Sequence, residues 1–180
     1  MTGQNRSSAV MQQRSEPHDS LDDFPTPPWA TRAVCEFLRE QGFDLSGADC
    51  REPCANRGHM VRPLLEEFAV VLASDIFDYG AGFTVRDYLF GPVEEDDETA
   101  WTFINPPFRL AQEFIERALA LSRVGVVVIA RSAFAEGQDR AKSLFVSNPP
   151  SFELQFSERV VMLKGRLVRS GAVDPLADKP

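Results

Sequence analysis

Residues 100–130 read AWTFINPPFRLAQEFIERALALSRVGVVVIA. An apolar run stops at NPP (105–107), an amphipathic run follows over 108–122, and a β-branched run occupies 124–130. Proline has no N–H to donate and is confined to strand ends, edges and bulges, so the two prolines end the first strand. The stretch therefore predicts a strand, a helix and a second strand, and we expect the 124–130 strand to lie at the centre of a sheet.

The same alternation extends to both sides of this stretch. Helices are predicted over 27–43, 56–68 and 136–147, strands over 48–52, 69–77, 151–156 and 159–163, and a glycine-rich loop over 79–92. Strands that alternate with helices at this rhythm indicate an α/β fold with a doubly wound, mostly parallel sheet. Ligands of such sheets lie beyond the carboxyl ends of the strands. We therefore expect one crevice to be faced by the residues that follow the strands: Glu52, Pro53, Asp75, Asn105, Pro106, Pro107, Phe108, Arg131 and Ser132.

The length of 180 residues suits one domain, which we predict over 21–170. No window approaches the ~20 apolar residues of a membrane helix, so no membrane association is expected. Residues 1–20 are polar and predict a disordered lead-in rather than a secretory signal, and 171–180 are predicted to be a flexible tail. The three cysteines lack CxxC spacing, which favours reduced, partly buried thiols in a cytoplasmic protein over a disulfide framework or a metal site: Cys35, Cys50 and Cys54.

The formal net charge of −8 argues against binding to phosphate backbones through a broad basic surface. The charge is nevertheless uneven. An acidic block over 94–98 is interpreted as a solvated loop, whereas the stretch 159–169 contains basic residues and no acid. That stretch and the loop after Phe134 are the candidates for contact with nucleic acid, although solvated charge explains the basic residues equally well.

The NPPF tetrapeptide (105–108) offers a specific chemistry. A residue before proline is held in an extended conformation, so Asn105 and Pro106 are both fixed. The Asn105 side-chain oxygen and the Pro106 carbonyl become rigid acceptors beside the flat face of Phe108. This arrangement suits a planar ring with an exocyclic –NH2 group, whose nitrogen becomes a better nucleophile when both N–H groups are hydrogen-bonded. Taken alone, the tetrapeptide fits a helix start capped by Asn105 equally well.

Together, several segments resemble the S-adenosylmethionine-dependent DNA adenine N6-methyltransferases, in particular the small ones of bacteriophages. Five segments carry the resemblance, which spans roughly 22–168 in the family's order: DFPTPPWAT (23–31), EPCANRGHM (52–60), SDIFDYG (74–80), VRDYL (85–89) and NPPF (105–108). It implies the Rossmann-like fold of class I methyltransferases and transfer of a methyl group to adenine in DNA. The target adenine would be flipped out of a duplex or taken from a single strand.

The resemblance also implies roles for individual residues. Asp75 would hold the ribose hydroxyls of S-adenosylmethionine, Asp87 would accept from its adenine amino group, and no metal would be needed. The remaining cofactor contacts would come from Phe24, Thr26, Pro27, Glu52, Pro53, Ala55, Asn56, Gly58, Ile76 and Tyr88. The target adenine would be held by Asn105, Pro106, Pro107 and Phe108.

Two departures from the family pattern stand out. Asn56 occupies the place of a glycine, and asparagine is the residue that best tolerates left-handed dihedral angles after glycine. The family's final strand is expected to be absent or to be replaced by residues 165–173, which would expose a sheet edge. Two alternatives therefore stay open: methylation of another planar amine (cytosine N4, an RNA base or a glutamine amide), or a catalytically inactive protein that keeps the cofactor.

Overall fold

The computed structural model describes residues 22–93, 97–136 and 141–168. The expected lead-in (1–20), the expected tail (171–180) and most of the acidic block lie outside these ranges. Within them, no helix is both long and apolar enough to cross a membrane.

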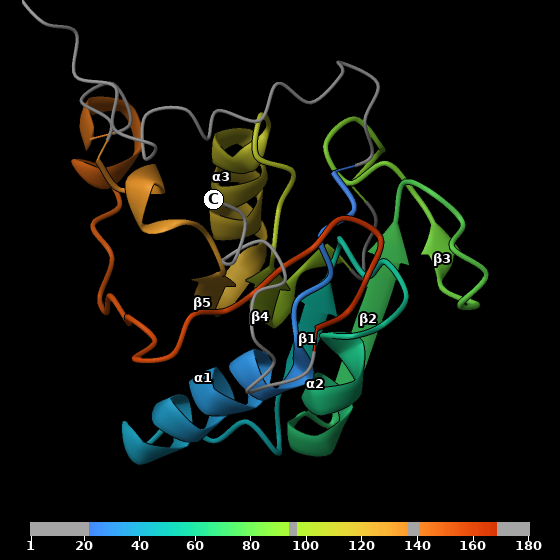
Figure 1. Ribbon diagram of the computed structural model, residues 1–180. Coiled ribbons are helices and arrows are strands. Elements are labelled where there is room, and N and C mark those ends of the chain that lie inside the picture. The colour runs from blue at the N-terminus through green and yellow to red at the C-terminus, as the bar shows by residue number, and fades with distance from the viewer. Residues whose placement is uncertain (1–21, 94–96, 137–140, 169–180) are drawn as a thin grey trace, which may run out of the picture.

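In the described part of the chain, five parallel strands form a single sheet in the order β3-β2-β1-β4-β5, as the alternating pattern predicts (Figure 1). The strands are β1 (Asp49–Glu52), β2 (Val70–Asp75), β3 (Thr84–Val85), β4 (Thr99–Ile104) and β5 (Ser122–Val128). The chain moves outward from β1 to β2 and β3 on one side, and from β4 to β5 on the other. The switch point of the topology therefore lies between β1 and β4, which is where doubly wound sheets bind ligands.

Helices cover both faces of the sheet. Helices α1 (Pro28–Glu40) and α2 (Val61–Glu67) pack on one face, and α3 (Ala111–Leu121) packs on the other (Figure 1). Two short turns follow β5: a 3₁₀ turn at Ser132–Phe134 and a π turn at Ala141–Phe145. Pro28 opens α1 and Pro63 lies in the first turn of α2, two places where a missing N–H costs little.

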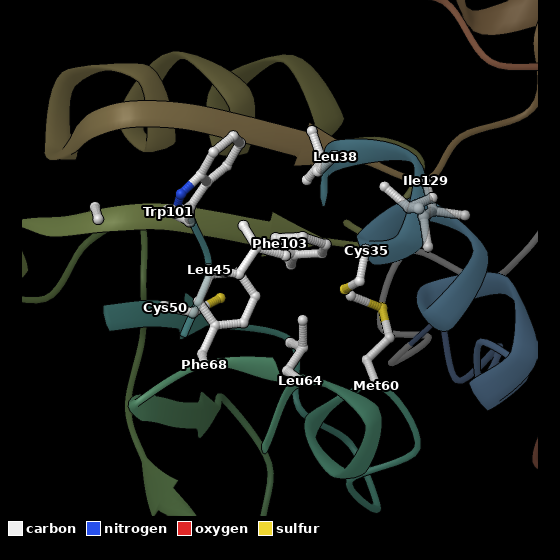
Figure 2. Packing of buried hydrophobic residues seen from close by; sticks show 12 residues of the cluster. Cys35, Leu38, Leu45, Cys50, Met60, Leu64, Phe68, Trp101, Phe103 and Ile129 are labelled. Carbon is white, nitrogen blue, oxygen red and sulfur yellow. The ribbon is translucent and has the colours of Figure 1, made fainter. Parts of the chain in front are cut away.

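Strand β4 divides the core because its side chains alternate between the two faces. Trp101 and Phe103 point toward α1 and α2, where they pack with Cys35, Leu38 and Leu64 (Figure 2). On the other face, Ile104 packs with Phe114, Ile115, Ala118 and Leu121 of α3. All six residues of β4 are buried, which makes β4 the strand that anchors both layers.

Several predicted elements differ in the structure. Strand β5 lies at the edge of the described sheet rather than at its centre, since it pairs only with β4 there and leaves Val124 55% exposed. β-Branched composition indicates a strand, but the crossover connections decide its place. The predicted loop 79–92 contains the short strand β3. The predicted helix 136–147 is seen only as the π turn, because 137–140 lie outside the described residues.

The predicted strands 151–156 and 159–163 are wrong. In the described residues this segment makes no sheet pairing apart from one isolated bridge between Leu163 and Arg166. Instead it runs back across the molecule (Figure 1) and packs aromatic side chains on α1. Phe156 lies edge-on to Trp29 with ring centroids 5.3 Å apart, and Phe152 lies edge-on to Phe37 at 5.2 Å. Its apolar residues therefore cover a helix rather than extend the sheet.

Candidate functional site

A cavity of about 280 Å³ opens at the carboxyl ends of β1, β2 and β4. It lies at the switch point of the sheet, where the topology predicts a ligand site. Twelve of the residues proposed from the sequence line it: Phe24, Thr26, Glu52, Pro53, Ala55, Asn56, Asp75, Ile76, Asp87, Tyr88, Asn105 and Pro107. Six others do not line it: Pro27, Gly58, Pro106, Phe108, Arg131 and Ser132.

The loop after β1 forms the floor of the cavity in the conformation expected from its sequence. Asn56 and Gly58 both have positive φ angles, of 49° and 78°. The backbone angle at Gly58 favours glycine, and a Cβ atom there would lie 2.8 Å from the ring of Phe83, which would have to move. Asp75, at the end of β2, accepts a hydrogen bond from the Asn56 backbone N–H at 2.9 Å. This bond fixes the ends of β1 and β2 relative to each other.

A second connection, which the sequence did not reveal, ties this loop to the segment before α1. The Asp23 carboxylate accepts hydrogen bonds from the Asn56 side chain at 2.6 Å and from the Arg57 guanidinium at 3.0 Å. The Asp23 carbonyl also accepts from the backbone N–H of Gly165 at 2.8 Å. Asp23 therefore holds three distant parts of the chain together at the rim of the cavity.

Burial disfavours the charged form of two carboxylates in the cavity, those of Glu52 and Asp75. Glu52 is fully buried: its Oε1 accepts from the Cys54 backbone N–H at 2.9 Å, and its Oε2 has no hydrogen-bond partner among the described residues. Burial raises the pKa of Glu52 well above its ordinary value of 4.5. Burial also raises the pKa of Asp75. Such groups, held at the edge of a cavity, are characteristic of binding and catalytic sites.

Replacing Glu52 by glutamine is expected to stabilise the protein at neutral pH in the absence of ligands. Because the pKa of Glu52 is raised by folding, the folded protein binds a proton that the unfolded chain releases. The free energy of unfolding of the wild type should therefore fall as the pH rises above 4.5, until Glu52 is fully ionised. Urea unfolding at about pH 5 and about pH 8 should show this fall in the wild type and a smaller one in Glu52→Gln. Glu36→Gln, an exposed change on α1, is the control and should keep the wild-type profile.

The segment 86–92 forms another wall of the cavity. Asp87 Oδ1 accepts hydrogen bonds from the backbone N–H groups of Leu89 and Phe90, both at 3.0 Å. The Tyr88 ring packs against Phe114 of α3 with centroids 5.4 Å apart. The Tyr88 hydroxyl is buried without a hydrogen-bond partner among the described residues, and burial raises the pKa of Tyr88 to about 12.

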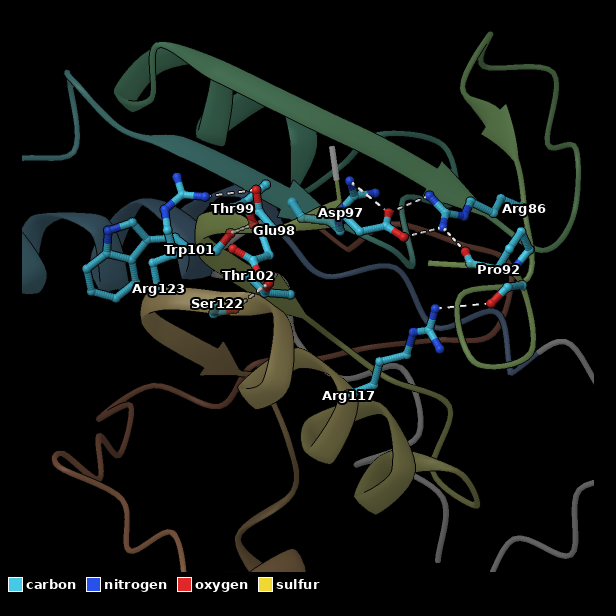
Figure 3. A network of polar contacts seen from close by, with 12 residues as sticks. Arg86, Pro92, Asp97, Glu98, Thr99, Trp101, Thr102, Arg117, Ser122 and Arg123 are labelled. Atoms are coloured by element: carbon cyan, nitrogen blue, oxygen red, sulfur yellow. Dashed lines mark hydrogen bonds and ion pairs between the residues drawn. The ribbon is translucent and has the colours of Figure 1, made fainter. Parts of the chain in front are cut away.

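Buried ion pairs hold this wall in place (Figure 3). Asp97 is 1% exposed and accepts two hydrogen bonds of 2.6 Å from Arg86, one at each carboxylate oxygen. The Arg51 Nη2 atom lies 3.2 Å from Asp97 Oδ1. Arg117 of α3 donates to the backbone carbonyls of Leu89 and Gly91. The interpretation of the acidic block as a solvated loop is therefore wrong for Asp97, because two arginines distant in the sequence surround it.

The Asn105 amide has a fixed orientation at the end of β4. Its Nδ2 donates to the Phe24 carbonyl at 2.9 Å and lies 3.0 Å from Thr26 Oγ1. A carbonyl oxygen can only accept, so the nitrogen must face Phe24, and Oδ1 is the amide atom left to accept from a ligand. Helix α3 begins at Ala111 with Leu110 as its cap, so Asn105 does not cap that helix. This excludes the helix-start interpretation of NPPF.

Phe108 lies beside the cavity rather than in its wall. Its backbone N–H donates to Asp22 Oδ2 at 2.6 Å, and its ring is 5.6 Å from the ring of Phe24. The guanidinium carbon of Arg131 lies over the Phe108 ring, 4.4 Å from its centroid. Phe108 as a whole residue is 38% exposed. The Phe24 ring therefore supports the Phe108 ring, and the Arg131 guanidinium partly covers the face of Phe108 that was expected to receive a planar ring.

His59 and Tyr79 also line the cavity, and the sequence analysis assigns no role to either. His59 Nδ1 is buried without a partner among the described residues, and burial lowers the pKa of His59, with help from Arg62 and Arg57. The Tyr79 ring lies under the Arg57 guanidinium at 4.8 Å. Both lie in segments that carry the resemblance, 52–60 and 74–80, but only the fold shows that they line the cavity.

No protein-family model matches the chain, and no curated protein matches it. Solved structures match at the level of the fold. A candidate RNA methyltransferase from Pyrococcus horikoshii superposes with a TM-score of 0.53 at 17% identity, over 71% of this chain and 74% of its own. Magnesium protoporphyrin IX methyltransferase from Synechocystis PCC 6803 gives a TM-score of 0.46 at 16% identity, over 59% of this chain and 60% of its own. The first match shows that the expected Rossmann-like fold is shared with a protein described as a methyltransferase.

Proposed function

We propose that this protein transfers a methyl group from S-adenosylmethionine to the N6 amine of adenine in DNA. The observation that carries the proposal is the position of Asn105. Its amide is oriented so that Oδ1 is left to accept, and it lines the same cavity as Glu52, Asp75 and Asp87. Asn105 Oδ1 would be the acceptor for the target amine, and its closeness to acidic residues that suit a nucleoside cofactor supports this role.

Each part of S-adenosylmethionine would have a matching group in the wall of the cavity. The Asp75 carboxylate would accept from the ribose hydroxyls, and Ile76, which is 61% exposed at the cavity, would lie against the adenine ring. Asp87 would accept from the adenine amino group through Oδ2, since Oδ1 is occupied by two backbone N–H groups. The methionine end would lie near Phe24 and Thr26, close to Asn105.

The chemistry requires little of the protein besides alignment. S-adenosylmethionine, when bound, supplies a methyl group already activated on a sulfonium centre. Asn105 Oδ1 and the Pro106 carbonyl would accept the two hydrogens of the target amine and hold its lone pair toward the methyl group. The target base would be single-stranded or extruded from a duplex, at a cost of a few kcal/mol.

A second candidate is methylation of a different planar amine. The two acceptors recognise an –NH2 group without distinguishing the ring or chain that carries it, so cytosine N4, an RNA base or a glutamine amide also fits. The match to a candidate RNA methyltransferase is compatible with the RNA alternative. A catalytically inactive protein that retains the cofactor is the third possibility.

Tritiated methyl transfer separates these candidates. The protein would be incubated with labelled S-adenosylmethionine and one of three substrates: unmethylated DNA, RNA of the same sequence, or a glutamine-containing peptide. Digestion and nucleoside analysis should show label in N6-methyladenine from DNA. Label in another nucleoside or in the peptide would replace the proposed substrate, and cofactor binding without any transfer would support the inactive protein.

A further inference from the structure

We propose that Arg131 determines the substrate class of this site: its guanidinium covers Phe108 in the free protein and moves to a backbone phosphate of the target strand when the base takes its place. The inference rests on the proposed function and deepens it, because it requires an anionic polymer as substrate. A neutral amide on a peptide would not use such a residue.

Position gives the first support. Arg131 follows β5 and caps the 3₁₀ turn Ser132–Phe134, which places it at the same edge of the sheet as the cavity. Its backbone carbonyl accepts from the Phe134 N–H at 2.8 Å, so the backbone is anchored while the side chain is exposed. The side chain can therefore change its position without disturbing the fold.

The contact with Phe108 gives the second support. A guanidinium is planar and delocalised, and it stacks on aromatic rings much as a nucleobase does. At 4.4 Å from the ring centroid, it occupies the face on which a planar base would stack. Phe24 supports the same ring from within the fold, 5.6 Å away and itself 4% exposed. Phe108 is thus a supported platform, and the group now on it is an exposed side chain.

The pairing of charges gives the third support. Several arginines of the described chain form ion pairs with acids: Arg32 with Glu66, Arg57 with Asp23, Arg86 with Asp97 and Arg123 with Asp49. Arg131 forms no ion pair with any residue in the ranges 22–93, 97–136 and 141–168. In a chain of net charge −8, a cation without an acidic partner at the edge of the site suits a phosphate.

The test compares Arg131→Ala and Arg131→Lys with the wild type in binding a fluorescein-labelled, single-stranded oligodeoxyadenylate. Anisotropy titrations at several salt concentrations give the slope of log Kd against log[salt]. Loss of one phosphate contact on a single strand should reduce that slope by about 0.7 and weaken binding about fivefold at 0.1 M salt. Arg131→Lys should keep the wild-type slope, because an ammonium group still contacts phosphate.

Arg123→Ala is the matched control, since it removes the same charge at the opposite end of β5. It should leave the slope unchanged. A wild-type slope and affinity in Arg131→Ala would overturn the inference, as would tighter binding, which would mean that the guanidinium only shields Phe108. The binding readout does not depend on turnover. If the slope falls in Arg131→Ala but the wild type transfers no methyl group, only the proposed function is contradicted. If the wild type transfers a methyl group but the slope is unchanged in Arg131→Ala, only the inference about Arg131 is contradicted.

Discussion

Replacing Asn105 by alanine is expected to abolish methyl transfer while leaving the affinity for S-adenosylmethionine within a few-fold of the wild type. The variant loses Oδ1, the acceptor that would hold the target amine, whereas Asp75 and Asp87 on the cofactor side are untouched. Removing one preorganised hydrogen-bonding group from an active site typically costs about 10²–10³-fold in kcat. Label incorporation under saturating cofactor and calorimetric titration with S-adenosylmethionine measure the two quantities separately.

A control is needed because Asn105 also holds the segment before α1. Its Nδ2 donates to the Phe24 carbonyl, so alanine could act by loosening that segment. Thr26→Val removes the hydroxyl that Nδ2 contacts but keeps Oδ1 and the Phe24 bond. Measured with saturating S-adenosylmethionine, which offsets any lost contact of Thr26 with the methionine end, this variant should lose far less activity than Asn105→Ala. Equal losses would assign Asn105 a purely structural role, and full activity in Asn105→Ala would remove it from the reaction.

Removal of the Asp97 carboxylate should have the largest effect on stability. Asp97→Ala leaves Arg51 and Arg86 buried without their shared acid, at side-chain exposures of 4% and 13%. Breaking a buried pair in this way typically costs about 3–5 kcal/mol, because two buried arginines lose the carboxylate that they share. Urea unfolding measures the loss. Asp97→Asn, which keeps the shape, allows the comparison even if the alanine variant does not fold.

Glu66→Ala is the matched control for Asp97. Glu66 also pairs with an arginine at 2.6 Å, but both side chains are 49% exposed. Such surface pairs contribute about 0–1 kcal/mol, since water and salt screen them. We expect a much larger loss for Asp97, together with weaker cofactor binding, because Arg86 also holds the segment 86–92 through the Pro92 carbonyl. Similar losses in both variants would contradict the structural role given to Asp97.

The parts of the site that the sequence could predict are those fixed by local chemistry. Proline restrains the residue before it and ends strands, so NPPF predicts the end of β4 from the sequence alone. Positive φ angles favour glycine and asparagine, so Gly58 and Asn56 marked the turn after β1. The polar residues after strands converge because parallel strands present their carboxyl ends at one edge.

The parts that the sequence could not predict depend on partners far along the chain. Asp97 looked solvated within an acidic run, and only the positions of Arg51 and Arg86 make it a buried anchor. The apolar pattern of 151–163 resembled strands, but Phe152 and Phe156 pack on α1 instead. The contact between Arg131 and Phe108 depends on how the ends of β4 and β5 approach each other, which no local pattern specifies.

Calorimetric titration with S-adenosylmethionine tests most directly whether the cavity between β1, β2 and β4 is a cofactor site. We expect saturable binding at one site in the wild type and at least about tenfold weaker binding in Asp75→Ala, a change of about 1.4 kcal/mol. No binding by the wild type, or the same affinity in both proteins, would contradict it.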